Sequence, residues 1–297
     1  MSDVSKTSHL PRPTLRNSGR QRSILHLDLD TFFVSVERQM DSRLEGHPVL
    51  IGGTGDRGVV ASCSYEARAF GVHSGMSMKM ARTMCPKAIV IRGNSMAYSK
   101  QSEVVTEIVS ESVPICEKSS IDEFYADLSG MDRFIGCWKF SRELRKRIIQ
   151  ESGLPISVGL STSKTVAKVA TGEAKPNNSR QVSRGAERHF LAPLSIRKIP
   201  MVGAETYRTL RNLGISTILT LQNMPVELIQ QVLGKNGVAI WKKAHGLDES
   251  PVVAYNERKS ISTERTFAKD TTDGEKLHAI ILAMAENLAF QLRRGDK

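Results

Sequence analysis

In residues 23–30 (SILHLDLD), leucine alternates with histidine and aspartate. The alternation predicts a strand with one face in the core and a polar face that carries Asp28. Apolar residues at strand or helix spacing continue from there to about residue 183. They predict further strands at 48–51, from 59, and at 89–91, 121–128 and 156–160, with helices at 32–40, 65–70, 76–84, 97–112, 134–151 and 165–174. Interleaved strands and helices predict an α/β or α+β domain whose sheet is backed by helices.

The pattern changes at about residue 184. From there to residue 250, short helical stretches are separated by proline and glycine, which predicts a small helical domain. Residues 251–259 are typical of a linker, 260–267 of a strand and 277–293 of a long helix. One strand and one helix, roughly 40 residues together, cannot bury a core of their own. We therefore expect residues 260–297 to form an incomplete third domain.

The composition is that of a folded, basic protein. Lysine and arginine number 42 against 31 aspartate and glutamate, giving a formal net charge of +11, which favours a polyanionic partner, nucleic acid first. No apolar run approaches the ~20 residues of a membrane span. Residues 1–22 are typical of a flexible basic tail, without the apolar stretch of a secretory signal. The four cysteines form no C-x-x-C pair, so we expect reduced thiols, no zinc site and a cytoplasmic location.

The loop at residues 53–58 (GTGDRG) matches the dinucleotide-binding pattern G-x-G-x-x-G. That pattern binds a dinucleotide only where it follows a strand and opens a helix. Here the residues after the loop, GVVASCS, indicate a second strand. The loop is therefore predicted to be a hairpin turn.

Three carboxylates are candidates for metal chemistry. Asp28 lies near the end of the first predicted strand, and Asp122 and Glu123 lie at the start of a later one. Adjacent side chains of a regular strand point to opposite faces, so this pair can reach one site only where the strand begins, turns or bulges. Oxygen ligands suit Mg²⁺, and two such ions can activate a 3′-hydroxyl and stabilise a pyrophosphate leaving group. The alternative is that the pair caps a strand or binds surface cations.

Basic and aromatic residues supply candidate phosphate contacts. Tyr65 and Arg68 share a face of a predicted helix at i, i+3, and Lys175 follows another helix. An arginine fork, a phenol and a lysine can bind a triphosphate, although each of them alone is more typical of a solvated surface. Residues 199–203 (IPMVG) resemble the hairpin of a helix-hairpin-helix motif, where amides contact DNA phosphate. An ordinary helical turn is the alternative.

Four blocks of sequence occur together in one order: 26–37 (HLDLDTFFVSVE), 58–76 (GVVASCSYEARAFGVHSGM), 119–129 (SSIDEFYADLS) and 158–177 (VGLSTSKTVAKVATGEAKPN). With these blocks the chain resembles the Y-family DNA polymerases, the low-fidelity translesion class, and within it the bacterial DNA polymerase IV branch. The resemblance runs from residue 24 to about residue 294.

The resemblance implies an α+β fold. Its parts are a palm with an antiparallel-type mixed sheet backed by helices, inserted small fingers, a helical helix-hairpin-helix thumb and a partial little finger. The implied boundaries are a tail at 1–22, palm at 23–33 and 94–183, fingers at 34–93, thumb at 184–250, linker at 251–259 and incomplete little finger at 260–297.

The resemblance also implies roles for single residues. Asp28, Asp122 and Glu123 are expected to bind two Mg²⁺ ions and to be the catalytic carboxylates, with the Leu29 carbonyl near the metal. Phe33 matches the family's steric gate, whose ring leaves no room for a 2′-hydroxyl and so rejects ribonucleotides. Four further side chains match the nucleotide-binding positions of the family: Ser62, Tyr65, Arg68 and Lys175.

The implied activity is template-directed addition of dNTPs to a primer 3′-end in translesion synthesis, by a monomer without membrane attachment or a proofreading domain. Three features depart from the family pattern. Met201 replaces the first glycine of the usual I-P-G-V-G, and because methionine disfavours positive φ, we expect Gly203 to carry the DNA contact. The little finger matches only at its beginning, and the usual C-terminal clamp-binding peptide is absent. A sliding clamp is therefore expected only for a full-length form.

Two other functions stay open at this point. The chain is a DNA-binding remnant with little activity if the incomplete little finger prevents synthesis. A nucleotide cyclase shares a palm-type sheet and two-metal chemistry, but the thumb hairpin and the charge of +11 argue against it, since a cyclase has no duplex to hold.

Overall fold

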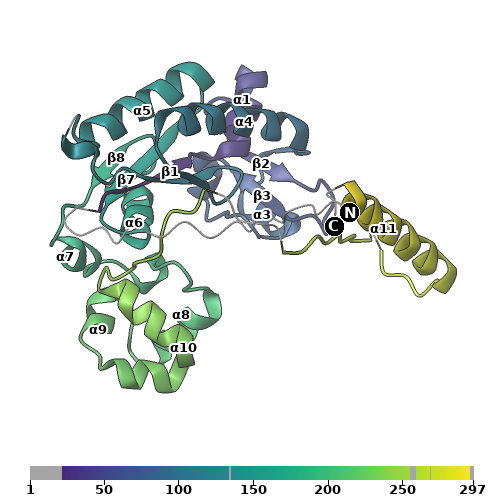
Figure 1. Ribbon diagram of the computed structural model, residues 1–297. Helices are drawn as coiled ribbons and strands as arrows, with labels where there is room; N and C mark the ends of the chain where they lie inside the picture. Colours follow the sequence, from purple (N-terminus) through teal and green to yellow (C-terminus); the bar gives the residue numbers. More distant parts are fainter. Residues whose placement is uncertain (1–21, 134, 255–258, 268, 295–297) are drawn as a thin grey trace, which may run out of the picture.

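The computed structural model describes residues 22–133, 135–254, 259–267 and 269–294 (Figure 1). Its larger sheet has the strand order β5-β6-β1-β7-β8. The bounds are β1 Ile24–Leu29, β5 Cys116–Lys118, β6 Glu123–Asp127, β7 Ile156–Ser161 and β8 Ser179–Gln181. Strand β1 is antiparallel to both β6 and β7, whereas β7 and β8 are parallel. The predicted α+β fold with a mixed sheet is confirmed.

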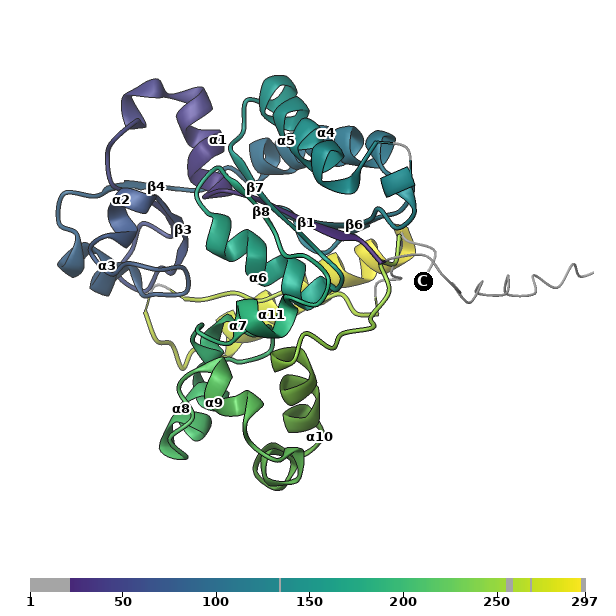
Figure 2. The same cartoon turned by 90° about the vertical axis from the view of Figure 1, so that its left-hand side faces the viewer.

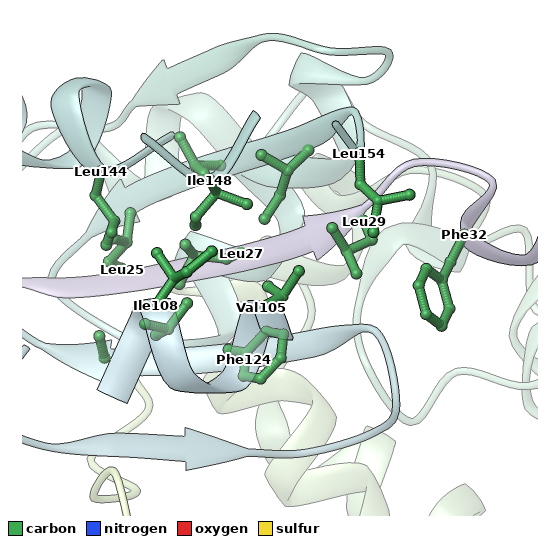
Figure 3. Close-up of a cluster of buried hydrophobic side chains, with 14 of the residues drawn as sticks. Leu25, Leu27, Leu29, Phe32, Val105, Ile108, Phe124, Leu144, Ile148 and Leu154 are labelled. Carbon is green, nitrogen blue, oxygen red and sulfur yellow. The ribbon is translucent and has the colours of Figure 1, made fainter. Parts of the chain in front are cut away.

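Helices cover both faces of this sheet. Helices α4 (Ser95–Ser112) and α5 (Cys137–Ser152) cover one face, and α6 (Lys164–Ala174) lies against β1 and β7 on the other (Figure 2). The leucines of β1 point towards α4 and α5, where Figure 3 shows them among side chains such as Ile108 and Ile148. The opposite parity of β1 therefore faces α6, and it carries His26 and Asp28.

A second sheet, in the order β3-β2-β4, follows α1 (Phe32–Met40). Its strands are β2 Val49–Gly52, β3 Val60–Cys63 and β4 Ile89–Ile91, and its helices are α2 Tyr65–Arg68 and α3 Met78–Met84. Strands β2 and β3 are antiparallel, so the G-x-G-x-x-G loop is the predicted hairpin turn. A Cβ on Gly58 would lie 2.3 Å from the Gly53 carbonyl oxygen. Close contact between the two backbones explains the glycine at this position. Phosphate binding is not needed to explain it.

Short helices form a third unit after residue 184. They are α7 Glu187–Leu191, α8 Ala204–Asn212, α9 Ile218–Gln222 and α10 Val226–Ala244, with a 3₁₀ turn at Ile196–Lys198. Earlier in the chain, 3₁₀ turns lie at Ser42–Leu44 and Met131–Arg133. Gly234, at φ 61° and ψ −145°, interrupts α10. Val166 and Val169 of α6 belong to the core of this unit, together with Leu210 and Ile240. Helix α6 therefore packs against the large sheet and the helical unit at once.

The C-terminal segment differs from its prediction in one respect. The long helix is present as α11, Gly274–Arg294, and none of its residues is buried. The strand predicted at 260–267 is not formed: the described residues of this range are irregular. A strand is stable only beside a partner, and no partner strand lies next to this segment in the described part of the chain.

None of the helices in residues 22–133, 135–254 and 269–294 combines the length and the apolar character of a membrane span.

Candidate active site

Strands β1 and β6 bring the three predicted carboxylates together. Asp28 is the register partner of Glu123, and the Leu29 amide donates a hydrogen bond to the Asp122 carbonyl at 3.0 Å. Asp122 lies one residue before β6 begins, where the backbone is not yet a regular strand. The Ser120 hydroxyl donates to Asp122 Oδ1 at 2.6 Å and accepts from the Glu123 amide at 3.1 Å. This turn allows two consecutive acidic residues to serve one site.

Two lysines bind these carboxylates directly. Lys175 Nζ lies 2.5 Å from Asp28 Oδ1, and Lys168 Nζ lies 2.6 Å from both carboxylate oxygens of Glu123. Burial, together with repulsion from Glu123 and Asp122, outweighs the attraction of Lys175 and raises the pKa of Asp28 to about 7. Burial therefore disfavours the charged form of Asp28 even though Lys175 is its ion-pair partner.

The carboxylates fit a hard divalent cation by the chemistry of their donors. All three supply carboxylate oxygens, the ligands that Mg²⁺ prefers, from β1 and from the start of β6. Within the described residues, no three histidine, cysteine, aspartate or glutamate side chains already converge as a metal cage. Asp28 and Glu123 instead form ion pairs with Lys175 and Lys168, whose ammonium groups supply the positive charge beside them.

A cavity of about 170 Å³ opens beside Asp28. Seven of the predicted site residues line it: Asp28, Leu29, Phe33, Ser62, Arg68, Asp122 and Lys175. Side chains from β1, α1, β3 and α2 thus meet at the site, although they are far apart in the sequence. The cavity is polar on its carboxylate side and aromatic at Phe33.

Phe33 has an aromatic support that the sequence pattern did not reveal. Its ring stacks on Tyr98 of α4 with centroids 4.3 Å apart and planes 13° apart. The Tyr98 hydroxyl donates to Glu37 Oε1 at 2.5 Å, and burial together with this hydrogen bond raises the pKa of Tyr98 to about 12. A neutral, hydrogen-bonded phenol fixes the ring, and the ring in turn limits the movement of Phe33.

The triphosphate candidates form a connected group. The Arg68 guanidinium lies 5.0 Å from the centroid of the Tyr65 ring, and the Tyr65 hydroxyl donates to Asp30 Oδ1 at 3.3 Å. Tyr65 lines an adjoining hollow, whereas Arg68, which lies over its ring, lines the cavity beside Asp28. Burial and the nearby Asp30 charge raise the pKa of Tyr65 above its ordinary value, so the phenol stays a hydrogen-bond donor.

Asp30 organises this group and was not among the predicted site residues. It is 1% exposed and accepts hydrogen bonds from the Ser157 hydroxyl at 2.8 Å and the Asn177 amide at 2.6 Å. Lys175 Nζ is 3.9 Å from its carboxylate. Asp30 has the same strand parity as Asp28. The alternation in residues 23–30 therefore already indicated that the two aspartates share the polar face.

Gly203, the predicted DNA contact, lies apart from this cavity at the start of α8. It follows a turn in which the Val202 amide donates to the Ile199 carbonyl at 3.1 Å, with Pro200 and Met201 at the centre. Met201 adopts φ 85°, the region that a type II turn requires and that glycine favours. The hairpin backbone is therefore retained although its glycine is replaced.

The chain is similar to solved structures of DNA polymerases. DinB from Sulfolobus solfataricus has a TM-score of 0.72 at 26% identity, over 78% of this chain and 69% of that one. An insertion ternary complex of Dbh DNA polymerase has a TM-score of 0.69 at 27% identity, over 77% of this chain and 69% of that one. The fold and its cavity thus define a Y-family type of DNA polymerase.

Sequence comparison gives the family itself. Residues 27–172 match the impB/mucB/samB family, and residues 258–297 match its C-terminal domain. DNA polymerase IV of Dehalococcoides mccartyi (strain CBDB1) is 40% identical over 93% of this chain and 71% of its own length. DNA polymerase IV of Shewanella amazonensis is 37% identical over 92% of this chain and 78% of its own length. The chain belongs to the impB/mucB/samB family of Y-family DNA polymerases.

Proposed function

We propose that this chain is a template-directed DNA polymerase that adds dNTPs to a primer 3′-end in low-fidelity translesion synthesis. The observation that carries the proposal is the pairing of β1 with β6, which places Glu123 opposite Asp28 and brings Asp28 and Asp122 into the cavity that Phe33 also lines. The polymerase relatives favour this function over a nucleotide cyclase.

Asp28, Asp122 and Glu123 would hold two Mg²⁺ ions, with the Leu29 carbonyl as a further oxygen ligand. When bound, such ions make the primer 3′-hydroxyl more acidic and stabilise charge on the leaving pyrophosphate. The tight Lys168–Glu123 contact supports the need for positive charge at that carboxylate. Glu123 would exchange this lysine for the cation when substrate and metal arrive.

The remaining residues would orient the nucleotide. Arg68, Tyr65 and Lys175 would bind the triphosphate, because a guanidinium, a phenol and an ammonium group adjoin the carboxylates. Phe33 would lie under the sugar and exclude a 2′-hydroxyl. Ser62, 8% exposed on β3, would line the space over the new base pair.

We keep the subdomain boundaries that the resemblance implies. We assign the palm to 23–33 and 94–183, the fingers to 34–93 and the thumb to 184–250, with 251–259 as the linker and 260–297 as part of the little finger. Two core clusters support the separation of palm from thumb and a third supports the fingers. Helix α6 and strand β2 each contribute residues to more than one of the clusters. The proposed subdomains are therefore packed against one another at these two elements. Primer–template DNA would contact the thumb at Gly203.

Replacement of Asp122 by asparagine tests the assignment. The variant keeps the size of the side chain but removes a charge needed for the cations, so primer extension should fall by about a thousandfold or more. Glu107→Gln, on the exposed side of α4, is the matched control and should extend primers normally. Undiminished synthesis by Asp122→Asn would show that the catalytic carboxylates lie elsewhere.

A gel-shift assay on the same proteins separates synthesis from DNA binding. The polymerase proposal requires wild-type extension together with DNA binding by both wild type and Asp122→Asn. Binding without any extension by the wild type would favour the DNA-binding remnant.

A further inference from the structure

A second polar cavity, of about 250 Å³, lies at the opposite end of β1 from Asp28. It is formed where β1 begins and where β7 and β8 end. Ser161, the last residue of β7, is the register partner of Ile24, the first residue of β1. The residues that matter for its chemistry are Arg22, Ser23, Ser161, Thr162, Ser183 and Arg184. None of them belongs to the catalytic group described above.

Ser161 is the observation that points to a ligand here. Its side chain lines the cavity, the residue is only 4% exposed, and its Oγ has no hydrogen-bond partner among the described residues. Leaving a buried hydroxyl unsatisfied is unfavourable, and such groups are few in folded proteins. A hydroxyl in this position can donate a hydrogen bond to a molecule that enters the cavity.

The charges in the cavity favour an anion. Arg22 donates to the Asp248 carbonyl at 2.7 Å and to the Ser250 carbonyl, so its guanidinium is held by neutral groups. Within the described ranges, neither Arg22 nor Arg184 forms a salt bridge. Asp132 also lines the cavity, and its carboxylate accepts hydrogen bonds from the Cys137 amide at 2.8 Å and the Ser23 hydroxyl at 3.5 Å. Two arginines thus line the cavity together with one carboxylate that is already hydrogen-bonded.

We propose that this cavity binds a phosphate-type oxyanion, with Arg22 and Arg184 as the charged partners and Ser161 as a hydroxyl donor. Guanidinium groups match the oxygens of phosphate in shape and charge, and the neighbouring hydroxyls of Thr162 and Ser183 add further donors. The volume admits inorganic phosphate, pyrophosphate or the phosphate end of a nucleotide. The cavity is separate from the polymerase centre, so the proposal does not depend on the polymerase assignment.

Amide-resolved NMR titration of the full chain tests the site. Inorganic phosphate, pyrophosphate and dAMP are added separately to the Arg68→Gln variant, which weakens competing binding at the nucleotide cavity. We expect saturable shifts at the amides of Ser161, Ser183 and Arg184, and a loss of affinity of about tenfold or more in a second variant that also carries Arg184→Gln. Saturation with the free anions as well as dAMP identifies the phosphate group itself as the ligand, and saturation with dAMP alone identifies a nucleotide.

Exposed Arg142→Gln on α5 is the matched control and should leave the titration unchanged. Unshifted amides around the cavity at millimolar anion, or equal affinity in the Arg184→Gln protein, would overturn the proposal and leave a water-filled hollow. Thermal melts of Ser161→Ala add an independent measurement. Removing the unpartnered hydroxyl should raise the melting temperature without phosphate and reduce the further rise that phosphate produces. A melting temperature that responds to phosphate as in the wild type would contradict the role of Ser161.

Discussion

At the residue scale, the stacked pair of Phe33 and Tyr98 joins the proposed steric gate to the core. The rings are nearly parallel, and the tyrosine is in turn hydrogen-bonded to Glu37 on the helix that carries Phe33. The Phe33 ring is held on one face by the Tyr98 ring and is fixed to α1 by its own backbone. It cannot move away from a 2′-hydroxyl without disturbing several contacts.

Phe33→Ala should therefore admit ribonucleotides. Opening space under the sugar is expected to raise the ratio of ribonucleotide to deoxynucleotide incorporation by about a hundredfold, since the discrimination comes from steric exclusion worth roughly 3 kcal/mol. Single-nucleotide insertion kinetics with matched rNTP and dNTP measure the ratio. Phe70→Ala, an exposed aromatic in the same region of the chain, is the control. Unchanged sugar selectivity would remove Phe33 from the role of gate.

His26 makes the stability of the molecule sensitive to acid. It is fully buried between β1 and α6, its Nδ1 bonds to the Thr171 hydroxyl at 2.9 Å, and its Nε2 has no partner among the described residues. Burial first, and then the charges of Lys168, Lys175 and Lys164, lower the pKa of His26 well below 6.5. The folded protein therefore keeps His26 neutral, while the unfolded chain binds a proton below about pH 6.5.

This difference predicts that His26 contributes stability above about pH 6.5 and loses it as the pH falls below that value. Between pH 7.5 and 5.5 the loss attributable to this residue should be about 1 kcal/mol. Asp28, whose pKa is raised to about 7, has the opposite effect on stability, because the folded protein binds its proton more tightly than the unfolded chain. The contribution of His26 is therefore measured as the difference between wild type and a His26 variant. Urea unfolding of wild type and His26→Leu isolates it, with exposed His73→Leu as the control. Equal pH dependence in wild type and His26→Leu would contradict the prediction.

At the element scale, the hairpin before α8 forms although one of its residues has an unfavourable backbone conformation. Met201 occupies a position of the turn that needs positive φ, and its side chain is 54% exposed. The strain of a non-glycine residue in this region is of order 1 kcal/mol. Neighbouring contacts, such as that of Lys243 Nζ with Met201 Sδ at 3.2 Å, do not require methionine to form the turn.

Met201→Gly should consequently increase the free energy of unfolding by up to about 1 kcal/mol, after the entropy that glycine adds to the unfolded chain is subtracted. Met201→Ala is the matched control, because it removes the same side chain but keeps the Cβ that causes the strain. Chemical denaturation of the three proteins measures the effect. Equal gains in both variants would place the cost in the side chain rather than in φ.

At the scale of the whole molecule, the segment after the helical unit is bound to the large sheet. Val252 is buried with Ile24 and Tyr125, and the Val253 amide donates to Glu117 Oε2 at 2.8 Å. Glu117 Oε1 also binds Lys164 Nζ at 2.6 Å. One carboxylate on β5 thus joins α6 to the chain that leaves the helical unit.

Glu117→Ala should destabilise the protein by about 2 kcal/mol, because it leaves Lys164 and the Val253 amide without their partner. It should also speed proteolytic cleavage near residues 250–254, where the segment loses its attachment. Urea unfolding and limited proteolysis give the two measurements. Glu111→Ala, which removes an exposed pair with Arg147, is the control. Unchanged cleavage would show that the apolar contacts of Val252 alone hold the segment.

The sequence predicted the elements whose pattern is long and regular. The alternation in residues 23–30 gave β1 and both of its faces, and most helices were predicted with correct type and nearly correct bounds. Strands β5 (CEK) and β8 (SRQ) were missed because each is short and mostly polar, whereas the equally short β4 (IVI) is an apolar run. The strand at 260–267 was wrong, because local preference for an extended backbone does not supply a pairing partner.

The residue types at the site were also determined by the sequence, since oxygen ligands, an arginine, a phenol and an aromatic ring have fixed chemistry wherever they lie. Which of these residues come into contact with one another was decided only by the tertiary structure. Asp28 meets Lys175 across a sequence separation of 147 residues, and Phe33 meets Tyr98 across two helices. No local pattern encodes such contacts, because they arise when strand pairing and core packing bring distant segments together. The charge of the folded site, and with it the raised pKa of Asp28, exists only after that packing.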